Sequence, residues 1–172
     1  VPAIMEPLEA ALLLAEYARK PLPAFAWNVR QIDYLKEMGE VLGYRNWFEY
    51  GAICFAHPLR WDRDTADKFV HRVKAGYPTG LTAMPVAGMT APVTVAGFVV
   101  VASAEFFATW IAARCLNEKV ELQGSMWGGT IDMKTGSTSY STSDAMFRSF
   151  ATVEFIRRWC GKEVPVGGGE YG

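Results

Sequence analysis

The sequence lacks any strong excess of charge of one sign. It contains 17 lysine and arginine residues and 18 aspartate and glutamate residues, which gives a formal net charge of −1. Proteins that bind nucleic acid generally present a strongly basic surface, so this balance argues against a nucleic-acid partner. Histidine is also scarce, with two residues in the chain. Histidine and cysteine nowhere have the spacing of a zinc site, so we expect no metal site.

Cysteine and the common catalytic motifs are sparse as well. Cys54, Cys115 and Cys160 lie far apart and form no CxxC pair. We therefore expect buried free thiols in a reducing, cytoplasmic compartment. The glycine run 167–169 is not a GxGxxG motif, and no helix follows it in this sequence to bind a phosphate. No serine–histidine–aspartate or cysteine–histidine arrangement stands out, so no catalytic residue is assigned.

One long uncharged run raises the question of a membrane. Residues 81–104 carry no charge, and that length could cross a bilayer. Prolines, a glycine and a threonine within residues 85–92 break the run, and Glu105 follows Ala91 by only about fourteen residues. We expect a buried crossover helix and no membrane span. The start of the chain, Val1–Glu6, has no basic region and is not a signal peptide.

The hydrophobic pattern alternates between helix and strand. The expected helices are 5–19, 30–41, a segment from Asp62 or Asp64 to Lys74, 91–116 and 144–159, and the expected strands are 22–27, 50–56, 80–86, 120–123 and 164–166, with 124–141 as a long loop. Strict alternation of this kind predicts an α/β domain over residues 1–172, with a parallel sheet and crossover helices. The pattern alone fits an open doubly wound sheet or a barrel.

The stretch from Gly80 to Gly97 is expected to be the central β-to-α joint. Thr90 is a suitable N-cap for a helix that begins at Ala91, and Pro92 would lie in its first turn, where a missing N–H is tolerated. In α/β folds, ligands bind at such joints, beyond the carboxyl ends of the strands. The site is therefore expected at this end of the sheet.

The motif Met84–Gly97 (MPVAGMTAPVTVAG) resembles the core motif of the trimethylamine methyltransferase family, which includes glycine betaine methyltransferases that lack pyrrolysine. Two further segments look like the same family: Gly124–Trp127 with Ile131–Gly136, and the glycine run 167–169. All three occur in the family's order and spacing. The resemblance implies a (β/α)8 TIM barrel, of which this chain looks like a fragment of about five βα units.

The resemblance also implies an activity. It points to an enzyme that moves a methyl group from a methylated or quaternary amine, of the trimethylamine or glycine betaine type, to the cobalt of a corrinoid. A cognate partner protein would carry the corrinoid, and the chain itself would bind no cofactor directly. Because an incomplete barrel leaves open edges, we expect a homo-oligomer. Two alternatives remain: a non-catalytic barrel fragment that serves in assembly or binding, and a barrel lyase or isomerase acting on a small anion.

Candidate site residues lie on the loops that follow the expected strands. A quaternary ammonium has no N–H to donate, so aromatic ring faces would bind it. The expected substrate-binding residues are Trp27, His57, Trp127, Tyr140, Glu170 and Tyr171, and the expected loop residues are Gly88, Thr90, Gly124, Ser125, Asp132 and Gly168. Each has a structural alternative: core packing for an aromatic, a backbone hydrogen bond for His57, a solvated charge for Glu170, and ordering of its own loop for Asp132.

Overall fold

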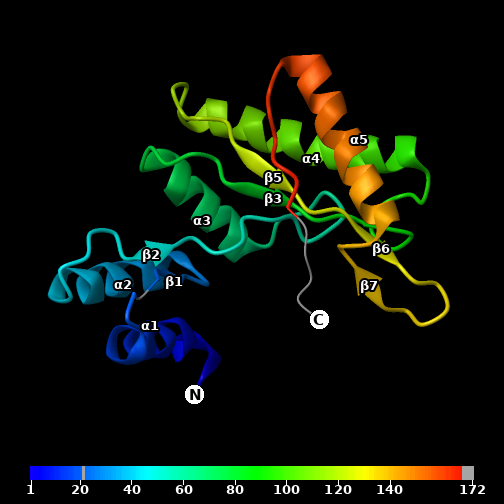
Figure 1. Cartoon of the computed structure of the whole chain (residues 1–172). Coiled ribbons are helices and arrows are strands. Elements are labelled where there is room, and N and C mark those ends of the chain that lie inside the picture. The colour runs from blue at the N-terminus through cyan, green and yellow to red at the C-terminus, as the bar shows by residue number, and fades with distance from the viewer. Residues whose placement is uncertain (21, 168–172) are drawn as a thin grey trace. The chain divides into compact units, whose positions relative to one another are not determined.

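A computed structural model describes residues 1–20 and 22–167 of the chain (Figure 1). It divides into two compact units, described separately below. The N-terminal unit contains Val1–Ile53 and Arg63–His71, and the C-terminal unit contains Cys54–Asp62 and Arg72–Gly172. Both are mixed α/β. The sheets of the described residues have two or three strands each, and none closes into a barrel.

The N-terminal unit pairs two helices with two short parallel strands. A 3-10 turn, Ala3–Met5, leads into α1 (Glu6–Tyr17); β1 (Ala24–Phe25), α2 (Val29–Val41) and β2 (Phe48–Glu49) follow, and α3 (Arg63–Lys74) belongs to this unit up to His71. Strand β1 pairs with β2 in parallel. The side chain of Asn28 accepts from the Gln31 N–H, and the Gln31 side chain accepts from the Asn28 N–H. This capping box confirms the predicted start of α2.

The strand expected over residues 50–56 is wrong. The strand lies earlier, at Phe48–Glu49, because Gly51 has φ +67°, a left-handed conformation that a regular strand does not contain. The strand expected at 120–123 also moves, to β5 (Gly124–Met126). Apolar composition predicted that both strands exist, but it placed each of them a few residues away from its observed position.

The sheets of the C-terminal unit are mainly parallel. Strand β3 (Leu81–Ala83) pairs with β5, and β4 (Val86–Ala87) pairs with β6 (Gly129–Ile131), both in parallel. Strand β7 (Thr138–Ser139) returns antiparallel to β6, so the expected long loop is partly a hairpin. Val166 makes a single parallel bridge to Met126, where a longer strand was expected. The segments 81–87, 124–131 and Val166 thus lie side by side in the order in which they occur in the chain.

Two helices cover one face of this sheet. Helices α4 (Val95–Leu116) and α5 (Ser143–Cys160) pack against each other and lie together beside β3 and β5 in Figure 1. The buried cluster between helices and strands includes Leu81, Met126, Phe98, Phe106 and Ile156. The side chains of Thr82 and Ser125 alternate with the buried strand residues and so point to the opposite face. A hydrogen bond of 3.2 Å joins their hydroxyl groups there.

Helix α4 continues past Glu105 and ends at Leu116, as expected. It is apolar and long enough to cross a bilayer by composition alone, with Glu105 inside it. The length argument against a membrane span therefore fails. The core-facing residues Phe98, Phe106 and Ala113 are fully buried against the rest of the unit. That packing is typical of a core helix.

The cysteines differ from expectation in their burial. All three are free thiols, as predicted. Cys115 and Cys160 are exposed, however, and Cys54 is half-buried. Cys115 and Cys160 lie at the ends of α4 and α5, where the helices extend past the core.

The expected cap at Thr90 is also wrong. Helix α4 begins at Val95, and the side chain of Thr94 caps it by accepting from the Gly97 N–H. Ala91 precedes a proline, which disfavours helical backbone there. The Thr90 hydroxyl instead accepts from the Val86 N–H at 2.9 Å and closes the turn after β4.

This reassignment predicts unequal effects of two threonine substitutions. Thr90→Ala removes the acceptor for the N–H of Val86, a residue that is only 5% exposed, and should lower the free energy of unfolding by roughly 1–3 kcal/mol. Thr94→Ala removes an exposed helix cap and should lower it by about 1 kcal/mol or less. Urea denaturation measures both, with Thr90→Ser as the control that keeps the oxygen. A larger loss for Thr94→Ala would contradict the assignment.

Candidate functional site

Trp127 marks the carboxyl end of β5 in the C-terminal unit. Its backbone N–H donates to the Ala83 carbonyl at 2.8 Å, and its side chain is half-buried. A Cβ atom added at Gly167 would overlap the indole ring. The Gly167 backbone therefore lies directly against Trp127, and only glycine fits there. These contacts hold the ring in one place.

Tyr140 lies at the same edge. A Cβ atom at Gly129 would lie 2.9 Å from Cε1 of the Tyr140 ring, so this ring also packs against glycine backbone. The Gly129 N–H donates to the Pro85 carbonyl, and the Gly128 N–H donates to the buried Ser149 hydroxyl at 3.0 Å. The two aromatic residues predicted from the sequence thus lie next to Gly128 and Gly129, whose backbone N–H groups both donate hydrogen bonds. We call this end of β5, with Trp127 and Tyr140, the Trp127 edge.

The turn after β4 contains the predicted loop residues Gly88 and Thr90. Gly88 has φ +86°, and a Cβ atom there would lie 2.9 Å from Cγ2 of Ile131. Val93 and Met133 also approach this point. Gly88 therefore allows the turn and the β6–β7 hairpin to come close together.

Asp132 orders the β6–β7 hairpin. Its carboxylate accepts from the Lys134 N–H at 2.8 Å and from the Thr135 hydroxyl at 2.9 Å. The Lys134 N–H, followed by the Thr135 hydroxyl, lowers the pKa of Asp132 below its ordinary 3.8. Of the two roles open from the sequence, the structure shows the ordering of its own loop.

The remaining predicted residues are dispersed. Gly124 and Ser125 lie within β5 rather than in a loop, and Gly124 packs against Phe106 at the amino end of the strand. Trp27 follows β1 in the N-terminal unit and is 58% exposed. Gly168, Glu170 and Tyr171 lie outside the described residues.

His57 forms a pair that the sequence did not reveal. Its Nδ1 lies 2.8 Å from Oε1 of Glu105, a fully buried residue in the middle of α4. The Leu59 N–H donates to the same oxygen at 3.3 Å. A single acid within an otherwise apolar helix was the available signal, since burial of such a residue requires a partner.

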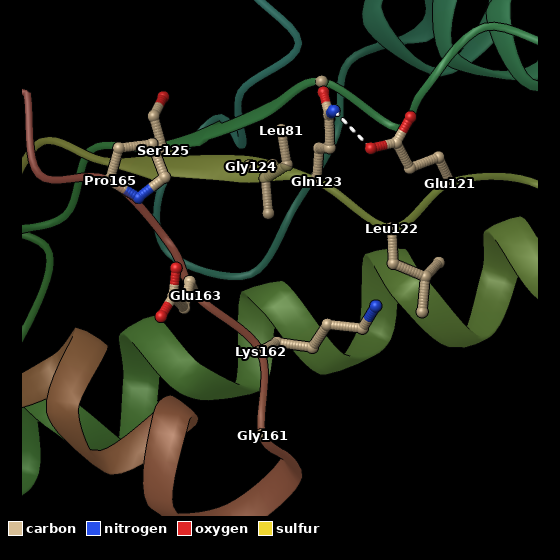
Figure 2. Close-up of a pocket in the computed structure, with 11 residues that line it drawn as sticks. Leu81, Glu121, Leu122, Gln123, Gly124, Ser125, Gly161, Lys162, Glu163 and Pro165 are labelled. Atoms are coloured by element: carbon tan, nitrogen blue, oxygen red, sulfur yellow. Dashed lines mark hydrogen bonds between the residues drawn. The ribbon is translucent and has the colours of Figure 1, made fainter.

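An open hollow lies at the other end of the strands. It has a volume of about 740 Å³ and is open to solvent (Figure 2). Its lining is Gly80, Leu81, Glu121, Leu122, Gln123, Gly124, Ser125, Gly161, Lys162, Glu163 and Pro165. Figure 2 shows its charged side chains at the amino ends of the strands, where α/β folds rarely bind substrate. Chemistry and topology both favour the Trp127 edge.

The hairpin geometry predicts a measurable titration. The pKa of Asp132 should lie below 3.8, and Thr135→Val should raise it because the hydroxyl that donates to the carboxylate is lost. Because the folded-state pKa is lowered, the carboxylate stabilises the hairpin above the ordinary pKa, and this effect disappears as pH falls through the lowered value. Carboxyl ¹³C NMR titration measures both. An Asp132 pKa at or above 3.8 would contradict the loop geometry.

Comparison with known proteins identifies the family. The family model described as trimethylamine methyltransferase (MTTB) matches residues 36–169, well over half of the chain. A search among curated proteins gave no match. The matched region contains the Trp127 edge, the Gly88 turn and the Asp132 hairpin. The chain belongs to the trimethylamine methyltransferase family.

Proposed function

We propose that this chain is part of a (β/α)8 barrel that transfers a methyl group from a methylated amine to the cobalt of a corrinoid carried by a partner protein. Membership of the family supports a methyltransferase acting on a methylamine. The corrinoid partner, the barrel and the residues of the site are the further content of the proposal. Each is supported below from a different observation.

The strand order supports the barrel. Parallel neighbours follow chain order, β1 with β2 in one unit and β3 with β5 and then Val166 in the other. Both crossover helices of the C-terminal unit lie on one face of its sheet. A doubly wound sheet reverses its strand order and carries helices on both faces, whereas a barrel does neither.

The face of the sheet opposite α4 and α5 supports the position of the site. In a barrel this face lines the interior. It carries the hydrogen-bonded pair Thr82 and Ser125, and Trp127 follows Ser125 by two residues, at the carboxyl end of the strand. Indole faces attract methylated ammonium groups through the ring quadrupole. Trp127 is the single observation on which the substrate class depends, with Tyr140 and His57 as further candidates in the same unit.

The chemistry requires positioning more than proton transfer. A methylated amine leaves as a neutral amine, so the protein must orient the N–CH₃ bond and exclude water. The corrinoid would supply the nucleophile that accepts the methyl group. The Trp127 and Tyr140 rings, fixed against glycine backbone, suit such a rigid cation site. Among the described loops at this edge Asp132 is committed to its own turn, which disfavours a lyase that needs a free carboxylate pair.

Trp127→Ala should weaken binding of a methylated amine far more than it weakens the fold. A cation–π contact of about 1–2 kcal/mol predicts a loss of roughly tenfold in affinity. Calorimetric titration with trimethylammonium and with glycine betaine measures the affinity, and urea denaturation measures the fold.

The matched control is Trp159→Ala, since Trp159 is 65% exposed on α5 and its ring packs against the Phe107 ring in a tilted arrangement. Its substitution should leave affinity unchanged, and Trp127→Phe should restore part of it. Equal losses for both alanine variants, or a collapse of the fold with Trp127→Ala alone, would make Trp127 a packing residue. Binding of neither amine to the unmodified chain would refute the proposed substrate class.

A further inference from the structure

The pair of His57 and Glu105 is buried inside the C-terminal unit. Glu105 has no exposed side-chain surface and the His57 side chain is 11% exposed. His57 comes from the segment Cys54–Asp62, and Glu105 from the middle of α4. The segment is therefore attached to the helix by two hydrogen bonds to one carboxylate oxygen, from His57 Nδ1 and from the Leu59 N–H.

Two polar atoms of this pair have no partner among the described residues. They are Nε2 of His57 and Oε2 of Glu105, and both are buried. Leaving a buried donor or acceptor without a hydrogen bond is unfavourable by about 1–3 kcal/mol, and more for a charged group. Ionisable groups kept at such a cost are often functional.

The hydrogen bonds determine which ring nitrogen carries the proton. An ionised carboxylate only accepts hydrogen bonds, and Oε1 of Glu105 already accepts from the Leu59 N–H. His57 Nδ1 therefore donates to Glu105. In the neutral ring, Nε2 is then left with a lone pair and can accept a hydrogen bond. Free imidazole in water favours the opposite arrangement, with the proton on Nε2.

We propose that Glu105 is a positioning residue for His57: it holds the Nδ1–H form of the ring and so presents Nε2 as an acceptor for the N–H of a protonated methylamine. The inference rests on the proposed function, because that function supplies an ammonium ligand. Glu105 itself does not contact the ligand and acts through His57.

The first test reads the ring nitrogens directly by ¹⁵N NMR of the unmodified chain. The chain has only two histidines, and His71, whose Nδ1 lies 2.9 Å from the Tyr50 hydroxyl, is the internal reference. The spectra are recorded at a pH well above the ordinary histidine value of about 6.5. His57 should then carry its proton on Nδ1. A proton on Nε2, or on both nitrogens, would overturn the inference.

The second test uses two substitutions at Glu105. Glu105→Leu removes the acceptor and should shift the proton of His57 to Nε2, with at least a tenfold loss of trimethylammonium affinity and an unchanged His71 spectrum. Glu105→Gln keeps an acceptor oxygen and should retain both the Nδ1–H form and most of the affinity. Equal losses for the two variants would overturn the acceptor role. If Glu105→Leu does not fold, the tautomer of His57 in the unmodified chain still tests the inference.

A third test compares two ligands and distinguishes failure of this inference from failure of the proposed function. Trimethylammonium, which has one N–H, should shift the Nε2 resonance of His57, whereas tetramethylammonium, which has none, should bind without this shift. Failure of every methylated amine to bind would refute the proposed function, while the ligand-free tautomer would still test Glu105. Binding of trimethylammonium with an unchanged His57 spectrum would refute the inference and leave the proposed function intact.

Discussion

The parallel pairing of β3 with β5 determines the position of the proposed ligand site in the C-terminal unit. Parallel strands need a long crossover between them, and α4 supplies it. Because both strands run the same way, the loops that follow them meet at one edge. The alternation of side chains then sends Leu81, Ala83 and Met126 toward the helices and Thr82 and Ser125 to the other face. One strand pair thus separates the core from the polar face that leads to Trp127.

The sequence predicted the helices better than the strands because helix ends carry local signals. Asn28 and Thr142 cap α2 and α5, and Gly161 ends α5 in a left-handed conformation. Strands of two or three residues have no comparable signal, since their position depends on a partner far away in the chain. The error at Thr90 has the same origin. Its hydroxyl had two possible N–H partners, and only the folded turn shows that it accepts from Val86.

The loop position of two site candidates was predictable from the sequence, and their burial was not. The sequence predicted Trp127 and Tyr140 within the loop 124–141 that follows the strand expected at 120–123, and the structure places them after β5 and after β7. The partner of His57 could not, because Glu105 lies 48 residues away in the sequence and an acid in a helix usually faces solvent. Gly124 was misjudged for a similar reason. Its role is to let β5 approach Phe106, which only the packing of α4 against the sheet reveals.

Glycine connects the fold to the proposed chemistry. At the Trp127 edge, Gly129 and Gly167 have no side chain, so an aromatic ring can pack directly against the backbone of each. A ring held this way has little freedom left to lose when a cation binds, so the binding energy is not spent on ordering the site. In the proposed reaction, methyl transfer depends on alignment of the N–CH₃ bond, and a rigid aromatic surface would supply that alignment. The glycines at this edge thus position the rings and supply no reacting group of their own.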